Sequence, residues 1–270
     1  MEAFSSDMAF EVARSLYEIR DYEGALARCG EILAAKPDHA AALALATTIR
    51  CRSDVIAGYR INLENRADRV AECRRNEAEF GYPDDFAPLL KAVPDEFGAI
   101  GCGKSHILAL TDALVRRKSP FCMVLEDDFD FLRPAADLIR SLDHMQSCGL
   151  RWDVLLLAGN EVLPYHQPPA APFLLRLLDS QTTAGYIVNR PYIPTLLASF
   201  TESVAQLERF RAFQPRKPVV ERFAIDIGWK TLQRRDHWYI ANPSFGHQRP
   251  GFSDIEGKMR DYSGSTFYRL

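Results

Sequence analysis

One stretch of the sequence, residues 121–130, constrains the fold more than any other. It holds five apolar residues that run directly into a segment rich in carboxylates. Those carboxylates are Glu126, Asp127, Asp128 and Asp130. A short continuous apolar run predicts a strand buried on both faces, as in a parallel sheet. Because ligands of open α/β sheets bind at the carboxyl ends of strands, the sequence predicts carboxylates where such a fold holds its ligands.

The spacing of these carboxylates indicates a bound cation. Side chains alternate along a strand, so we expect Glu126 and Asp128 to face one way and Asp127 the other. Carboxylates this close repel one another, and oxygen ligands suit Mg²⁺ or Mn²⁺, which commonly carries a phosphate or diphosphate. The alternative is a solvated acidic turn that follows the strand and caps the next helix.

The overall composition is that of an ordinary globular protein. The chain has 270 residues, 47% of them hydrophobic, which allows one large domain or two smaller ones. A net charge of −3 gives no electrostatic case for non-specific binding to nucleic acid. We expect no membrane span, no secretory signal and reduced core thiols, and therefore a cytoplasmic protein, peripheral at most to the inner face of the membrane.

The first part of the chain predicts a small all-α segment, residues 1–52. Its helical stretch, residues 7–50, resembles a tetratricopeptide repeat, with Ala13 and Ala25 at the helix crossing and Pro37 as terminator. One and a half repeats do not bury a core by themselves. We therefore expect either a helical cap on the rest of the chain or a docking module for a protein partner or a second copy.

Residues 53–270 predict a second, α/β domain, because apolar runs alternate with helical stretches. Strands are expected at residues 55–63, 121–126, 152–160, 181–188 and 238–240. Arg66 and Arg69 open the first helix of this domain and could form an anion site there, or a solvated helix start.

Two loops of this domain are expected to matter for a ligand. Residues 98–106 hold three glycines in six positions, which would let the backbone approach a ligand before a helix over residues 107–117. This segment does not have the spacing of a P-loop. Residues 164–172 are rich in proline and predict a loop that could act as a lid.

Several motifs together resemble glycosyltransferase family 25, which holds bacterial lipooligosaccharide β-galactosyltransferases and is related to collagen galactosyltransferases. The motifs are Ile61-Asn62-Leu63 with Arg66, Asp68 and Arg69; Gly101-Cys102 with Ser105-His106; Leu125-Glu126-Asp127-Asp128; Thr182-Thr183-Ala184-Gly185-Tyr186; and Asn242-Pro243 with Gln248 and Ser253-Asp254-Ile255. The resemblance covers residues 55–256 and depends on the order and spacing of the motifs, since each is weak alone.

This resemblance implies a GT-A fold, that is, a mostly parallel sheet flanked by helices. It also implies a UDP-sugar donor, typically UDP-galactose, inversion at the anomeric carbon, and Mn²⁺ or Mg²⁺ as cofactor. By the same resemblance Asp128 would bind the metal directly. Asp130 completes a second pattern, Asp-x-Asp, so the sequence does not decide which pair of carboxylates holds the metal. Glu126 and Asp127 would contact the ribose or metal-bound water. His247 is the candidate for a further ligand from the C-terminal segment, with an ordinary loop histidine as the alternative.

The remaining donor contacts implied by the resemblance come from three segments. Asn62 and Arg66, after the first strand, would lie near the uracil and ribose. Ser105 and His106 would hold the glycine-rich loop or the donor, and Thr183 would add a hydroxyl at the start of a later strand.

An inverting transfer needs a base that deprotonates the acceptor hydroxyl. Asp226 is the first candidate because of its position after the donor motifs, with a helix-capping role as the alternative. Trp229 would stack on a sugar face. Glu161, after a glycine-containing turn, is the reserve candidate for the base.

Two other functions remain open from the sequence. The carboxylates would also serve a metal-dependent nucleotidyltransferase or sugar-phosphate enzyme, and a degenerate transferase domain could bind a partner without turnover. The acceptor is open as well, because a glycan, a lipid-linked sugar such as lipooligosaccharide, and a protein all fit. A glucose or N-acetylated donor is open too, because fold and motif do not fix the sugar.

Overall fold

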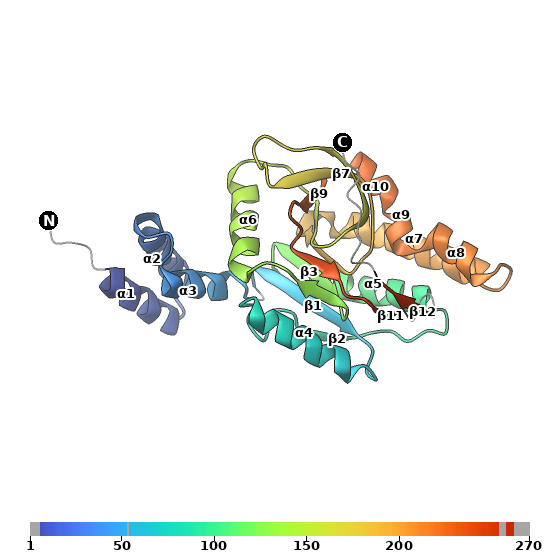
Figure 1. The fold of residues 1–270 in the computed structure, drawn as a ribbon, viewed down its shortest axis with the longest axis horizontal. Coiled ribbons are helices and arrows are strands. Elements are labelled where there is room, and N and C mark those ends of the chain that lie inside the picture. Colours follow the sequence, from blue (N-terminus) through green and yellow to red (C-terminus); the bar gives the residue numbers. More distant parts are fainter. Residues whose placement is uncertain (1–5, 53, 254–257, 262–270) are drawn as a thin grey trace.

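The computed structural model describes residues 6–52, 54–253 and 258–261. It has an α/β architecture, in which three N-terminal helices precede a domain built on an eight-stranded sheet with helices on both faces (Figure 1). Among the described helices, none combines the length and the apolar character that crossing a bilayer requires. Asp254 and Ile255 of the last sequence motif lie outside the described residues.

The N-terminal helices are α1 (Ser6–Glu18), α2 (Tyr22–Ala35) and α3 (Ala40–Arg50). They form a small apolar core of their own that includes Ala13, Cys29 and Ile32. Ala13 and Ala25 have no exposed surface. The segment lies to one side of the main domain, next to α6 (Ala135–Ser147) (Figure 1). An ion pair of 3.1 Å between Arg50 and Asp143 joins α3 to α6. Likeness to a tetratricopeptide repeat and a separate function for residues 1–52 stay predictions.

The central sheet has the strand order β2-β1-β3-β8-β5-β9-β7-β6. Its strands are β1 (Ile56–Asn62), β2 (Leu89–Lys91), β3 (Phe121–Glu126), β5 (Val154–Leu156), β6 (Asn160–His166), β7 (Leu174–Gln181), β8 (Gly185–Asn189) and β9 (Trp238–Ala241). β1 pairs in parallel with β2 and β3, and β5 pairs in parallel with β9. Within this sheet, β7 and β8 run against the other strands, so the sheet is mixed although most strands share one direction.

Helices cover both faces of the sheet, and each face has its own apolar core. The remaining helices are α4 (Ala67–Glu79), α5 (Gly98–Arg116), the 3₁₀ helix η1 (Arg190–Tyr192), α7 (Ile193–Phe210), α8 (Arg216–Phe223), α9 (Ile225–Gly228) and α10 (Lys230–Arg235). α5 and α7 pack on the face that receives Cys122 and Val124, whereas α6 packs on the face that receives Met123 and Leu125. The expectation that β3 is buried on both faces is confirmed.

Two small ribbons lie outside the central sheet. β4 (Phe129–Phe131) pairs antiparallel with β10 (Gly246–Gln248), and β11 (Gly251–Ser253) pairs with β12 (Lys258–Arg260). Only two residues separate β3 from β4, so the pairing of β4 with β10 brings the C-terminal strand β10 to the end of β3.

The glycine-rich segment is helical, which corrects the expectation of a loop before residue 107. α5 begins at Gly98, and its glycines allow close packing. A Cβ atom at Gly101 would lie 2.6 Å from the carbonyl oxygen of Val93, and one at Gly103 would lie 2.5 Å from Cγ2 of Val204. These glycines therefore serve the packing of α5 against its neighbours.

The segment around the proline-rich stretch also differs from the expectation. β6 continues through Pro164 to His166, and β7, which the sequence did not indicate, follows the intervening loop. The two strands pair with irregular register. Leu89–Lys91, where the sequence predicted no strand, forms the edge strand β2.

Candidate functional site at the end of strand β3

The turn between β3 and β4 carries the carboxylates, and a buried arginine holds its backbone. Arg60 on β1 has no exposed surface, and its Nη1 atom donates to the carbonyl oxygens of Glu126 at 2.8 Å and Phe129 at 3.3 Å. Nη2 of Arg60 lies 2.7 Å from Oε1 of Glu77 on α4, which balances its charge. Both ends of the turn are thus fixed by one guanidinium.

A second arginine holds the middle of the same turn. Nη2 of Arg249 donates to the carbonyl oxygen of Asp127 at 3.0 Å, and its backbone N–H donates to that of Asp128 at 2.6 Å. Its Nε atom lies 3.3 Å from Oδ2 of Asp130. We call Arg60 and Arg249 the arginine clamp, because together they bind the four consecutive carbonyls of residues 126–129.

Glu126 belongs to a buried hydrogen-bond chain on the α5 side of the turn. Its Oε1 atom accepts from Oγ1 of Thr183 at 2.6 Å and lies 3.2 Å from Nε2 of His106. Nδ1 of His106 lies 3.0 Å from the hydroxyl of Tyr186. Burial acts to raise the pKa of Glu126, but the hydrogen bond and charge of His106, the hydrogen bond of Thr183 and the charge of Arg69 together lower this pKa. Because His106 is fully buried, it acts through Glu126.

Asp128 is a carboxylate whose hydrogen bonding is incomplete among the described residues. Its Oδ2 atom accepts from Nε2 of Gln248 at 3.2 Å, and Oε1 of that amide accepts from Oγ1 of Thr182 at 2.8 Å. Its Oδ1 atom is buried and has no hydrogen-bond partner among the described residues. Burial, together with the charge of Glu126, raises the pKa of Asp128 to about 7. A carboxylate in this state would gain from a cation or a donor that completes its bonding.

Asp130 and His247 face each other across the ribbon of β4 and β10. Burial raises the pKa of Asp130, and Arg249 opposes that shift. The Oδ1 atom of Asp130 is also buried without a partner in the described part of the chain. Because side chains alternate along a strand, this pair lies on the face opposite Gln248, the residue that binds Asp128. The pairing of β4 with β10 therefore brings His247 to Asp130, but the three residues predicted to bind metal are divided between two faces of the ribbon.

Asp226 on α9 belongs to the same neighbourhood as Glu126. Its Oδ2 atom accepts from the backbone N–H of Thr182 at 3.2 Å, so it does not act as a helix cap alone. Burial raises the pKa of Asp226, and the charge of Glu126 contributes in the same direction. The fold thus gathers Glu126, Asp128 and Asp226, which we call the acidic cluster.

Glu161 lies apart from the acidic cluster. Its side chain is exposed and accepts a hydrogen bond of 2.7 Å from Gln181. Its φ of 50° is in the left-handed region, which is uncommon for a residue other than glycine. The structure gives it no described contact with Asp226 or Asp128.

The predicted donor residues after β1 lie at the same edge of the sheet as the acidic turn, because Ile61 pairs in register with Glu126. Asn62 is buried, and its Oδ1 atom has no partner among the described residues. Arg66 forms an ion pair of 3.2 Å with Asp68. Asp127 faces α4, where Nη1 of Arg69 lies 2.6 Å from its Oδ1 atom.

Ser105, expected to hold the glycine-rich loop or the donor, and Trp229, expected to stack on a sugar, are both core residues. Ser105 is fully buried and binds the chain before α5, donating to the carbonyl of Gly101 at 2.7 Å and accepting from the N–H of Val93 at 2.8 Å. Trp229 is also fully buried, and its Nε1 atom donates to the carbonyl of Ser180. Neither side chain has surface left for a sugar or a nucleotide.

Cys102 is a residue of this region that the sequence did not single out for chemistry. Its thiol, the imidazole of His106 and the carboxylate of Glu126 each offer one ligand atom, and these atoms lie within 4.8 Å of one another. Burial raises the pKa of this thiol well above its usual range. The feature of the sequence that could have pointed to Cys102 is its spacing of four positions from His106. That spacing is informative only if the segment is helical.

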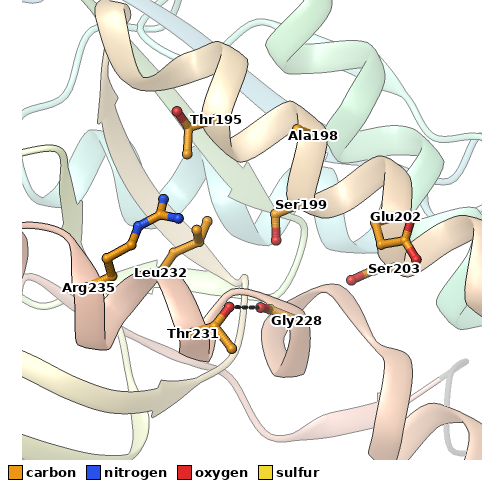
Figure 2. Close-up of a pocket in the computed structure, with 9 residues that line it drawn as sticks. All are labelled: Thr195, Ala198, Ser199, Glu202, Ser203, Gly228, Thr231, Leu232 and Arg235. Atoms are coloured by element: carbon orange, nitrogen blue, oxygen red, sulfur yellow. Dashed lines mark hydrogen bonds between the residues drawn. The ribbon is translucent and has the colours of Figure 1, made fainter.

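A cavity of about 500 Å³ lies elsewhere in the domain, between α7 and the segment of α9 and α10 (Figure 2). Its lining is mostly polar or small and includes Ser199, Glu202, Gly228, Thr231 and Arg235. Residues predicted from the sequence to bind donor or metal are not part of that lining. The candidate site is therefore defined by the acidic cluster and the arginine clamp.

The fold and this cluster define an α/β protein with buried carboxylates at the carboxyl end of a central strand. No model of a known protein family matches the chain, and no curated protein matches it either. A solved structure with a limited likeness is the crystal structure of mannose-1-phosphate geranyltransferase from Thermus thermophilus, with 13% sequence identity and a TM-score of 0.33. The likeness covers 71% of this chain and 65% of that one, so the chain spans about two thirds of the length of that protein.

Proposed function

We propose that the chain is a metal-dependent, inverting glycosyltransferase of GT-A type, similar to glycosyltransferase family 25. It moves a sugar from a UDP-sugar, with UDP-galactose as the first candidate, to a hydroxyl group of an acceptor. The observation that carries this proposal is Asp128, whose buried Oδ1 atom has no partner in the described chain and whose pKa is raised to about 7. Such an atom costs free energy until a ligand satisfies it.

The carboxylate oxygens at this site suit a hard divalent cation such as Mn²⁺ or Mg²⁺. Asp128 would hold the cation. Asp130, with its own unpartnered Oδ1 atom, and His247 are the further candidates, on the other face of the ribbon. The cation, when bound, would neutralise charge on the diphosphate of the donor.

The donor nucleoside would lie along the edge formed by the ends of β1 and β3. The unpartnered Oδ1 atom of Asn62 can accept a hydrogen bond from the uracil N–H or from a ribose hydroxyl. Arg66 would attract the phosphates, and Asp127 would keep Arg69 in place beside them. Thr183 and His106 would orient Glu126, which would face the ribose or metal-bound water.

Asp226 is the proposed base. It would take the proton of the acceptor hydroxyl while that oxygen bonds to the anomeric carbon and the bond from this carbon to the UDP oxygen breaks. Burial raises its pKa, which makes it a stronger base than an exposed aspartate. Glu161, which is exposed, remains the reserve candidate.

The acceptor would be a glycan, a lipid-linked sugar such as lipooligosaccharide, or a protein. Residues 7–50 would then serve to dock a protein partner or a second copy of the chain. The same carboxylates would also suit a nucleotidyltransferase or sugar-phosphate enzyme, or a binding protein without turnover, and the proposal must be separated from both by experiment.

The first experiment is a calorimetric titration of UDP-galactose into the purified protein with Mn²⁺ and with excess EDTA. We expect binding with Mn²⁺, loss of binding with EDTA, and loss in Asp128→Ala. The control Asp84→Ala removes an exposed carboxylate away from the cluster and should bind as the wild type does. Absence of binding for every UDP-sugar and every divalent cation would overturn the proposal.

Product analysis then separates the alternatives. Release of UDP together with a new glycosidic bond supports the transferase. Formation of a nucleotide-sugar and diphosphate would support the nucleotidyltransferase, and binding without either product, across a panel of acceptors, would support the binding protein.

A further inference from the structure

The ligand atoms of Cys102, His106 and Glu126 converge at one point beside the acidic cluster. Cys102 and His106 lie four positions apart on α5, so they share one face of that helix, and Glu126 reaches them from the end of β3. Nε2 of His106 is 3.2 Å from Oε1 of Glu126, and all three ligand atoms lie within 4.8 Å of one another. Ligands around a tetrahedral Zn²⁺ ion are about 3.5 Å apart, given metal–ligand distances of about 2.0–2.3 Å.

The groups behind these ligands are those that a metal site needs. Histidine ligands usually donate their second ring N–H to a neighbouring acceptor, which fixes the orientation of the ring. Here the hydroxyl of Tyr186 lies 3.0 Å from Nδ1 of His106, so it can accept that N–H while Nε2 binds a cation. Likewise, Oγ1 of Thr183 donates to Oε1 of Glu126 at 2.6 Å and holds that carboxylate in place.

The local charge also favours a cation at this point. Three carboxylates lie near Cys102, and their negative charges raise the pKa of its thiol: Glu126, Asp226 and Asp128. A divalent cation between them would relieve the repulsion among these carboxylates.

We infer that Cys102, His106 and Glu126 form a binding site for a thiophilic divalent cation such as Zn²⁺. A set of sulfur, imidazole and carboxylate ligands selects Zn²⁺ over Mg²⁺ or Mn²⁺, which prefer oxygen. Its ligands differ from those of the hard-cation site proposed at Asp128, although Glu126 is common to this site and to the proposed donor site. The inference does not depend on glycosyltransferase activity. The fourth position of the tetrahedron would be open to water.

The test is a titration of the metal-free full-length chain with Cd²⁺ and Co²⁺, followed by absorption spectroscopy. A sulfur–metal bond produces a charge-transfer band, and tetrahedral Co²⁺ adds visible bands. We expect both in the wild type. Cys102→Ser should abolish the charge-transfer band and lower the affinity for Zn²⁺ by at least about tenfold. Competition with a chelating indicator measures that affinity. Cys148→Ser, at a partly exposed thiol on the end of α6, is the matched control and should keep both.

Two further variants make the outcome specific. Tyr186→Phe removes only the hydroxyl behind His106. It should lower the affinity for Zn²⁺ by about 10–100-fold while the charge-transfer band remains. Asp128→Asn should leave the band unchanged, even where it abolishes Mn²⁺-dependent nucleotide binding. Circular dichroism checks that each variant is folded, and Cys102→Ala replaces Cys102→Ser if the serine variant is not. Absence of the band in the wild type, or its persistence in a folded Cys102 variant, would overturn the inference.

Discussion

The Nη1 atom of Arg60 donates a hydrogen bond of 2.8 Å to the backbone carbonyl of Glu126, across 66 positions of sequence. The guanidinium is fully buried and is balanced by Glu77 at 2.7 Å. The shape of the acidic turn therefore depends on an ion pair between β1 and α4. Because a buried charge that loses its partner is costly, this relationship leads to a stability prediction.

Glu77→Gln should lower the free energy of unfolding by about 3–5 kcal/mol, because it leaves the guanidinium of Arg60 buried without a full counter-charge. Urea denaturation followed by circular dichroism measures the loss. Glu79→Gln, at an exposed position of the same helix, should change stability by less than about 0.5 kcal/mol. Equal stability of the two variants would show that the ion pair does not hold the turn.

Arg249→Lys should weaken Mn²⁺-dependent binding of a UDP-sugar by about tenfold, since lysine keeps the charge but cannot reproduce the fork that reaches Asp127 and Asp130. Calorimetry measures the affinity, and urea denaturation measures stability in parallel. Arg140→Lys, at an exposed position of α6, provides the control. Unchanged affinity in a folded Arg249→Lys protein would mean that the clamp does not position the carboxylates.

Asp128→Asn should stabilise the protein when metal is removed with EDTA. The pKa of Asp128 is raised to about 7 in the folded state, above about 3.9 in the unfolded chain. Ionisation therefore costs the wild type stability as the pH rises between these two values, whereas asparagine does not ionise. We expect the advantage of the variant to be about 1–3 kcal/mol near pH 8 and to vanish near pH 4. Thermal unfolding across this pH range tests it, and a variant less stable than wild type at high pH would refute it.

Gly103→Ala should lower the free energy of unfolding by about 1–3 kcal/mol, because the added Cβ would lie 2.5 Å from Cγ2 of Val204 and force α5 away from α7. Gly30→Ala is the matched control. That glycine is also in a helix, α2, but a Cβ there meets nothing within 4 Å, so the substitution should stabilise by up to about 1 kcal/mol. Unfolding curves of the two variants should shift in opposite directions.

Asp226→Asn should reduce turnover by about 10²–10⁴-fold while leaving UDP-sugar affinity within a few-fold of wild type, because a general base acts on the acceptor and not on the donor. Glu161→Gln tests the reserve candidate in the same assay. If Glu161→Gln loses turnover and Asp226→Asn does not, the assignment of the base is reversed. Initial rates with a working acceptor, together with calorimetric affinities, separate the two cases.

The local pattern of the sequence was enough to place the central strand. The apolar run of β3 and the carboxylates that follow it were predicted correctly, as were β1, β9 and the start of α4. Each of these is encoded by periodicity or by a continuous apolar run within about 20 residues, so no knowledge of distant contacts was needed.

The glycine-rich segment shows where local reasoning fails. Glycine by itself favours loops, but Gly101 and Gly103 form part of α5. They are glycines there because neighbouring segments approach too closely for a side chain. The stabilisation comes from the packing of α5 against distant elements, which outweighs the weak helix propensity of glycine. The burial of Trp229 was missed for the same reason.

The sequence by itself determined that this chain would build an α/β sheet with carboxylates at the end of its central strand. Only the tertiary structure decided which of them have unpartnered oxygens, how Arg60 and Arg249 hold the turn, and that Cys102 meets His106 and Glu126. These features depend on contacts between residues as far apart as Asp127 and Arg249, which lie 122 positions from each other. Contacts of this kind form only when the whole sheet closes, since their free energy depends on burial that no local pattern encodes.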